Sequence, residues 1–174
     1  MAFSSEAVAN ELLRLAERDG KPITPMKLQK LAYIAHGWHL GLLDTPLLDE
    51  QVEAWKYGPV IPSLYHEFKE FRMRPITGRA STFAMLPSGG FKIHEPTMSD
   101  EDPEAAKPSM DVVEAVYKSY KDYTAVQLSN ATHRPETPWH DVYEVEWKGN
   151  PPQGTDIPTH KIRAHYKKLA GTSK

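Results

Sequence analysis

The sequence contains no cysteine, which excludes disulfide bonds, zinc sites built from thiolates and cysteine nucleophiles. It has no apolar run approaching the ~18 residues that a membrane-spanning helix needs. Residues 1–20 also lack the basic start and the long apolar stretch of a signal peptide. We therefore expect a cytoplasmic protein that has no membrane partner.

The sequence has no overall excess of basic residues, because its formal net charge is −2. A broad positive field that attracts nucleic acid is therefore excluded. Basic residues do gather near the C-terminus, at Lys161, Arg163, Lys167, Lys168 and Lys174. A basic helix can contact phosphates, but cations also suit the C-terminal end of a helix. Since the whole chain is slightly acidic, we expect a solvated helix face and no nucleic-acid binding.

The composition is that of an ordinary globular domain, with 40% hydrophobic and 25% charged residues. The pairs Thr24-Pro25 and Thr137-Pro138 are typical helix starts, because threonine caps the helix and proline fits its first turn. Helical spacing of apolar residues continues in several further segments. We expect six or seven helices, over residues 5–18, 25–42, 63–71, 109–123, 125–133, 138–147 and 159–171.

The middle of the chain has weaker signals for β structure. Alternating residues predict a short extended piece over 52–57, which Gly58-Pro59 should end. Residues 81–93 are consistent with a hairpin that turns at 88–90. The acidic segment 95–108 is expected to be a solvated loop with at most one helical turn. The sequence therefore predicts one compact, mainly α domain over residues 1–174, with a small β element in its middle.

Two pairs of residues could carry chemistry. His36 and His39 are three residues apart, which places them ~60° apart on a helix, but no HExxH motif accompanies them. Ser129 and His133 are four residues apart and could touch. A hydrolase would also need a third orienting residue and an oxyanion hole, and no motif supplies either. We therefore expect neither an enzyme nor a bound cofactor, and we keep a histidine-based metal protein or hydrolase as a last alternative.

The segment 28–42 has two stripes on one predicted helix, an apolar one and a second that mixes polar and apolar residues. The first contains Leu28, Leu31, Ala35, Trp38 and Leu42, and the second contains Gln29, Tyr33, His36 and Leu40. We expect the first stripe to face the core, with His39 buried at its border and hydrogen-bonded. Gly37 should permit close approach of another backbone. Lys27 and Lys30 lie outside both stripes and are expected to face solvent.

Three stretches of the chain, MKLQKLAYIAHGWHL, LLDEQVEAWKYGPVIPSLYHEF and LSNATHRPETPW, are similar to one known family. They resemble the Panacea domain, the SocA-like antitoxin domain that also occurs in phage-associated proteins. The residues that carry the resemblance are Leu28, Gln29, Tyr33, His36, Gly37, Trp38, Trp55, Tyr57, Gly58, Pro59, Ser129, His133, Pro138 and Trp139. The resemblance implies a mainly helical protein, encoded beside a toxin gene, that neutralises the toxin by protein–protein binding. It implies no active site.

These considerations leave two ways of neutralising a toxin. The first is direct binding, for which aromatic residues near the Gly-Pro turn are the interface candidates: Tyr57, Tyr65, His66 and Phe71. The second is delivery of the toxin to a cellular protease. The acidic segment 95–107 and the basic C-terminal residues are the exposed segments that favour such an adaptor role.

Overall fold

The computed structural model describes residues 2–100 and 102–172. Lys174 of the basic C-terminal run and Glu101 of the acidic segment therefore lie outside the described residues. Within them the chain forms seven α-helices: α1 (Ser5–Arg18), α2 (Pro25–Leu43), α3 (Pro62–Phe68), α4 (Pro103–Tyr120), α5 (Ala125–His133), α6 (Pro138–His140) and α7 (Thr159–Thr172). A 3-10 turn η1 (Lys69–Phe71) follows α3, and a π-helical segment η2 (Asp141–Glu146) follows α6.

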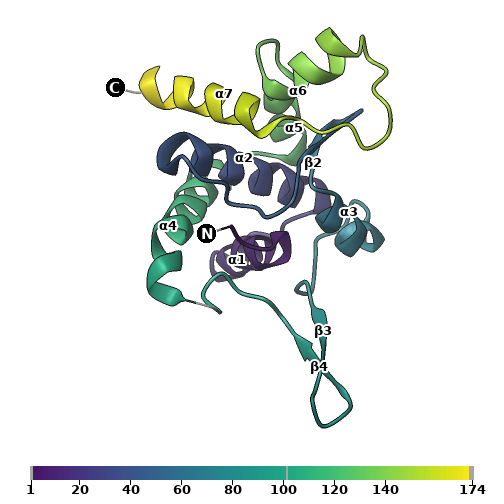
Figure 1. The fold of residues 1–174 in the computed structure, drawn as a ribbon, viewed down its shortest axis with the longest axis vertical. Coiled ribbons are helices and arrows are strands. Elements are labelled where there is room, and N and C mark those ends of the chain that lie inside the picture. Colours follow the sequence, from purple (N-terminus) through teal and green to yellow (C-terminus); the bar gives the residue numbers. More distant parts are fainter. Residues whose placement is uncertain (1, 101, 173–174) are drawn as a thin grey trace.

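Two small antiparallel sheets complete the fold. One pairs β1 (Glu53–Trp55) with β2 (Gly58–Val60), and the other pairs β3 (Thr82–Met85) with β4 (Phe91–His94). The prediction of a mainly α fold with a small β element is confirmed. In Figure 1 the helices form the body of the molecule, and the β3–β4 hairpin projects from it as an arm.

Helix α2 lies at the centre of the helical body, where it contacts α1, α3, α4, α5, α7 and β2 (Figure 1). Both of its stripes are buried, since Leu28 and Leu31 are covered on one side and Tyr33 and His36 on the other. A helix surrounded in this way needs apolar residues in nearly every direction. Leu42 was expected in the core but is 57% exposed, because it borders an open pocket between α2 and α4.

The contact between α2 and α7 depends on two glycines. A Cβ atom on Gly37 would lie 2.1 Å from the ring of Tyr166, and one on Gly41 would lie 2.9 Å from its backbone carbonyl carbon. The ring of Tyr166 also meets Trp38 edge-on, with a centroid distance of 5.5 Å. Gly37 therefore admits an aromatic ring, and the backbone approach expected there occurs one turn later, at Gly41.

Capping residues begin the helices as the sequence indicates. The side chains of Ser4, Thr24, Thr124 and Thr137 each accept a hydrogen bond from a backbone N–H in the first turn of the helix that follows. Helix α4 differs from the expectation, because it begins at Pro103 rather than near residue 109. Asp102 caps it through two backbone N–H groups, so much of the predicted acidic loop is the start of a helix.

The sequence predicts that Gly58-Pro59 ends the extended structure. In the structure this pair begins a second strand instead. The chain turns at Lys56-Tyr57, and Gly58 pairs with Trp55 as the second strand begins. Pro59 is accommodated because β2 is an edge strand that pairs only with β1 among the described residues, whereas β1 is also bridged to Asp156 on its other side. The predicted hairpin at residues 81–93 is confirmed, with four residue pairs between β3 and β4.

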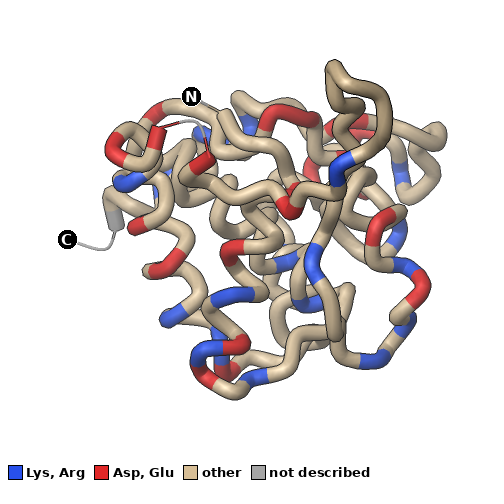
Figure 2. Tube along the Cα trace, turned by 90° about the horizontal axis from the view of Figure 1, so that it is seen from below, with Lys and Arg blue, Asp and Glu red and all other residues tan. Residues whose placement is uncertain are grey.

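Charged residues are distributed over the molecule without separation by sign. Figure 2 shows Lys and Arg interspersed with Asp and Glu along the chain. Among the residues that the structure describes, no helix is both long and apolar enough to cross a membrane.

Candidate functional site

Helix α2 holds the β1–β2 hairpin through two polar side chains. The amide of Gln29 donates to the carbonyl of Ile61 and accepts from its N–H, both at 2.9 Å. The ammonium of Lys30 donates to the carbonyls of Tyr57 at 3.1 Å and Pro59 at 3.0 Å. These four hydrogen bonds fix the backbone of β2 and of the turn before it, because each backbone partner is bound to a rigid, buried helix.

Helices α5 and α6 hold the same hairpin from another side. The hydroxyl of Ser129 donates to the carbonyl of Tyr57 at 3.2 Å. The indole N–H of Trp139 donates to the carbonyl of Trp55 at 2.7 Å. The ring of His133 bonds to the carbonyl of Ser129 at 2.5 Å, as expected near a helix C-terminus, and it packs edge-on against Trp139. The serine and the histidine thus contact backbone carbonyls, which leaves them no geometry for a nucleophile–base pair.

Gly58 allows these side chains to converge. Its φ angle of +113° lies in a region that residues with a side chain rarely adopt. A Cβ atom there would lie 2.7 Å from the ammonium of Lys30 and 3.0 Å from the ring of His133. The glycine therefore permits both the turn and the close approach of α2 and α5 to it.

Lys30 is buried, which corrects the expectation that it faces solvent. Its exposed fraction is 2%, because the β1–β2 hairpin covers the side of α2 that a single-helix projection leaves open. Burial lowers the pKa of its ammonium from the ordinary 10.5 to about 8. Two backbone carbonyls are its hydrogen-bond partners, and no carboxylate pairs with it within the described ranges.

A cavity of about 560 Å³ opens beside this hairpin. We call it the hairpin pocket. Residues from α2, the hairpin, α3 and the turn after it line the pocket, and its aromatic and cationic members are Lys30, Trp55, Lys56, Tyr57, Tyr65, Lys69 and Arg72. Met26, Val60 and Leu64 supply apolar wall. The pocket therefore combines a mostly apolar interior with a cationic rim.

The four predicted interface candidates separate into two groups. Tyr57 and Tyr65 both line the hairpin pocket, with exposed fractions of 66% and 42%. His66 is exposed beside Tyr65, and their ring centroids are 5.5 Å apart. Phe71 is half-buried and packs against Phe68, away from the pocket lining. The structure thus brings the two tyrosines together, with His66 at their edge.

None of the cations that line the pocket is among the interface candidates chosen from the sequence. Lys69 and Arg72 lie three residues apart at the two ends of η1, whereas Lys56 is in the β1–β2 turn and Lys30 in α2, so no spacing in the sequence predicts that all four line one pocket. One feature of the sequence indicates that Lys30 is unusual, because it interrupts a helix that is otherwise apolar in nearly every direction.

The histidine pair of α2 has structural partners. Nδ1 of His36 accepts a hydrogen bond from the N–H of Leu48 at 3.3 Å. His39 bonds to the carbonyl of Thr45 at 2.6 Å and to the hydroxyl of Ser109 at 2.9 Å. Together they fix the loop after α2 and connect it to α4. In the part of the chain that the structure describes, no three His, Asp or Glu residues are grouped to hold a metal ion.

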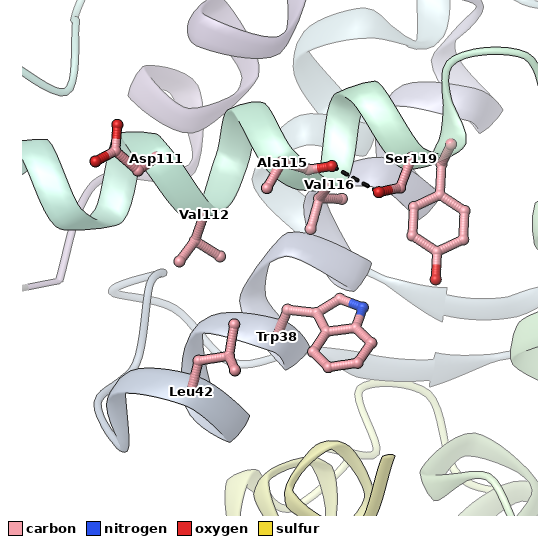
Figure 3. Close-up of a pocket in the computed structure, with 8 residues that line it drawn as sticks. Trp38, Leu42, Asp111, Val112, Ala115, Val116 and Ser119 are labelled. Carbon is pink, nitrogen blue, oxygen red and sulfur yellow. Dashed lines mark hydrogen bonds between the residues drawn. The ribbon is translucent and has the colours of Figure 1, made fainter. Parts of the chain in front are cut away.

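A second pocket, of about 330 Å³, lies between α2 and α4 (Figure 3). Trp38 and Leu42 of α2 face Val112 and Val116 of α4 across it. Its polar groups are few, and the hydroxyl of Ser119 already donates to a backbone carbonyl of α4. Because recognition needs polar groups that are free to orient a ligand, the hairpin pocket is the better candidate site.

Comparison with known proteins agrees with the resemblance. The family described as "Antitoxin SocA-like, Panacea domain" matches residues 28–140, a range that includes the four side chains from α2, α5 and α6 described above. Antitoxin SocA of Caulobacter vibrioides (strain NA1000 / CB15N) is 35% identical over 138 residues, which cover 79% of this chain and 69% of that protein. Comparison with solved structures gave no match. The chain therefore belongs to the SocA-like antitoxin family, whose common unit is the Panacea domain.

Proposed function

We propose that this protein neutralises a cognate toxin by binding it directly, and that the hairpin tip and the hairpin pocket form the binding surface. The observation that carries the proposal is the convergence of polar side chains from three helices on one short hairpin. Lys30, Ser129 and Trp139 bind its backbone, and Gln29 binds Ile61, the residue that follows it. Tyr57, at its tip, is left 66% exposed.

A rigid hairpin favours binding for a thermodynamic reason. Ordering a mobile side chain or loop at an interface costs roughly 0.5–1.5 kcal/mol for each group that is immobilised. Here the backbone of the tip is ordered before a partner arrives. Tyrosine, tryptophan and arginine are also the residues that most often dominate binding energy, and Trp55, Tyr57, Tyr65 and Arg72 all line this surface.

The first test is co-expression with the toxin encoded by the adjacent gene. We expect the wild-type protein to restore growth and to co-purify with the toxin. The double variant Tyr57→Ala/Tyr65→Ala should bind the toxin about 2 kcal/mol more weakly, roughly 30-fold in Kd, because two aromatic anchors are lost.

Tyr123→Ala is the matched control, since Tyr123 is 47% exposed and packs against Tyr120 at the end of α4. Its toxin affinity should equal that of the wild type. Equal affinity of the double variant, measured by calorimetry on folded protein, would show that the toxin binds elsewhere.

We propose delivery of the toxin to a cellular protease as a second candidate function, because the arm has features of a docking element. Phe83 pairs with Ile93 and Met85 with Phe91, and all four side chains are at least 64% exposed. Both edges of this two-stranded ribbon are open to an added strand. A pulse-chase of the toxin separates the two functions. A toxin lifetime that is unchanged while toxicity is suppressed excludes delivery.

A further inference from the structure

The cations around the hairpin pocket lack acidic partners. Lys30, Lys56, Lys69 and Arg72 line it, no Asp or Glu does, and none of the four forms an ion pair within the described residues. The cations in and directly after α1 and α4 behave differently. Arg14, Arg18, Lys21, Lys118 and Lys121 each lie within 3.1 Å of a carboxylate. These five cations are neutralised by carboxylates, whereas four cations gather at the hairpin pocket with no carboxylate in its lining.

Lys30 is the innermost of these cations. An ammonium group has three N–H donors, and the carbonyls of Tyr57 and Pro59 take two of them. A buried charge without a counter-ion is costly, because the protein interior screens it less well than water does. A carboxylate that enters the pocket would supply the missing charge and accept the third hydrogen bond.

The apolar part of the pocket restricts what such an anion can be attached to. Met26, Val60 and Leu64 form apolar wall, and the rings of Trp55 and Tyr65 meet edge-on at 4.8 Å. A free anion or a phosphate would leave this surface unused, whereas a peptide segment can place an apolar side chain there. The volume of about 560 Å³ is in the range of pockets that bury side-chain-sized groups.

We infer that the hairpin pocket receives an acidic segment of the toxin, in which an apolar side chain is flanked by aspartate or glutamate. The apolar side chain lies against Leu64 and Trp55, and the flanking carboxylates meet the cationic rim. This inference rests on the proposed function, since it names the part of the toxin that the hairpin surface binds.

The test compares charge reversals inside and outside the pocket, and the control Lys168→Glu is matched in net charge to Lys56→Glu. Lys69→Glu/Arg72→Glu removes two exposed rim cations and should raise the Kd for the toxin at least ~10-fold. Lys56→Glu, at the hairpin tip, should act in the same direction independently. The control Lys168→Glu changes an exposed lysine of α7 outside the pocket and should leave the Kd unchanged. Raising the salt from about 0.1 M to 1 M should weaken the wild type more than the double variant.

A crosslink locates the segment. A benzophenone amino acid in place of Tyr57, irradiated in the complex with the toxin, should attach to a toxin peptide that contains Asp or Glu beside an apolar residue. Changing those acids to lysine should restore binding to Lys69→Glu/Arg72→Glu.

The inference is overturned if the wild type binds the toxin and the folded charge-reversal variants bind it equally well. It is also overturned if the crosslinked peptide has no acidic residue. A single-stranded oligonucleotide that binds the wild type but not the double variant, while the toxin binds both, would make the pocket a nucleic-acid site instead. If the wild type does not bind the toxin at all, the proposed function itself fails.

Discussion

At the scale of single residues, two polar side chains of α2 have roles that depend on burial. Lys30 and His36 are both less than 4% exposed, and each bonds to backbone of another segment. The burial of Lys30 could not be predicted from the helix alone. A helical projection places Lys30 outside both stripes, where a lysine is expected to face solvent. Lys30 is buried because the β1–β2 hairpin packs against that side of α2.

His36 makes the stability of the fold depend on acidity. Burial, together with the nearby His39, lowers the pKa of His36 from 6.5 to about 4. Between these two values the unfolded chain binds the proton and the folded chain does not, so unfolding becomes more favourable as the pH falls. The contribution of His36 is complete above pH 6.5 and decreases by roughly 3 kcal/mol as the pH falls to 4.

The variant His36→Asn checks this prediction, because its side-chain oxygen can accept from Leu48 but does not titrate. Urea unfolding between about pH 7 and about pH 4, a range that spans the two pKa values, should show a smaller loss of stability for the variant than for the wild type. His39 still contributes, since burial lowers its pKa too. An identical loss in both proteins would remove His36 as the cause.

At the scale of elements, the α2–α7 contact is the most demanding packing in the fold. Gly37→Ala should destabilise the protein by about 1–3 kcal/mol, because its Cβ atom would overlap the buried ring of Tyr166. In a Tyr166→Ala background the same change should cost much less, since the two positions are in contact. Thermal or urea unfolding measures both.

Gly171→Ala is the matched control for this substitution. Gly171 is also in a helix, α7, and a Cβ atom there has no neighbour within 4 Å. We expect it to be neutral or to stabilise by up to ~1 kcal/mol, because alanine favours the helix over glycine. A loss as large as that of Gly37→Ala would mean that backbone effects, and not the Tyr166 ring, determine the cost.

The elements show why sequence patterns predict some features and miss others. Helix starts at Thr24 and Thr124 depend on neighbours three residues away, so the sequence predicts them correctly. Strand β2 is held by Lys30 from a distant helix, so a local reading of Gly58-Pro59 as a break misses the strand that begins there. The pocket cations come from separate segments, and only the fold brings them together.

At the scale of the whole molecule, three family motifs that are far apart in the sequence meet at the β1–β2 hairpin. Side chains from the stretches around residues 28–38 and 128–139 bind the backbone of the stretch 53–60. The conspicuous His, Trp and Tyr residues of α2 mostly build the core. The surface that these residues support is formed by the hairpin tip, α3 and the turn after it.

The most direct test of this account is hydrogen–deuterium exchange of the protein with and without its toxin. We predict that the toxin slows exchange chiefly in residues 53–72, which form the hairpin tip, α3 and η1. Protection confined to the β3–β4 arm, with residues 53–72 unchanged, would contradict it.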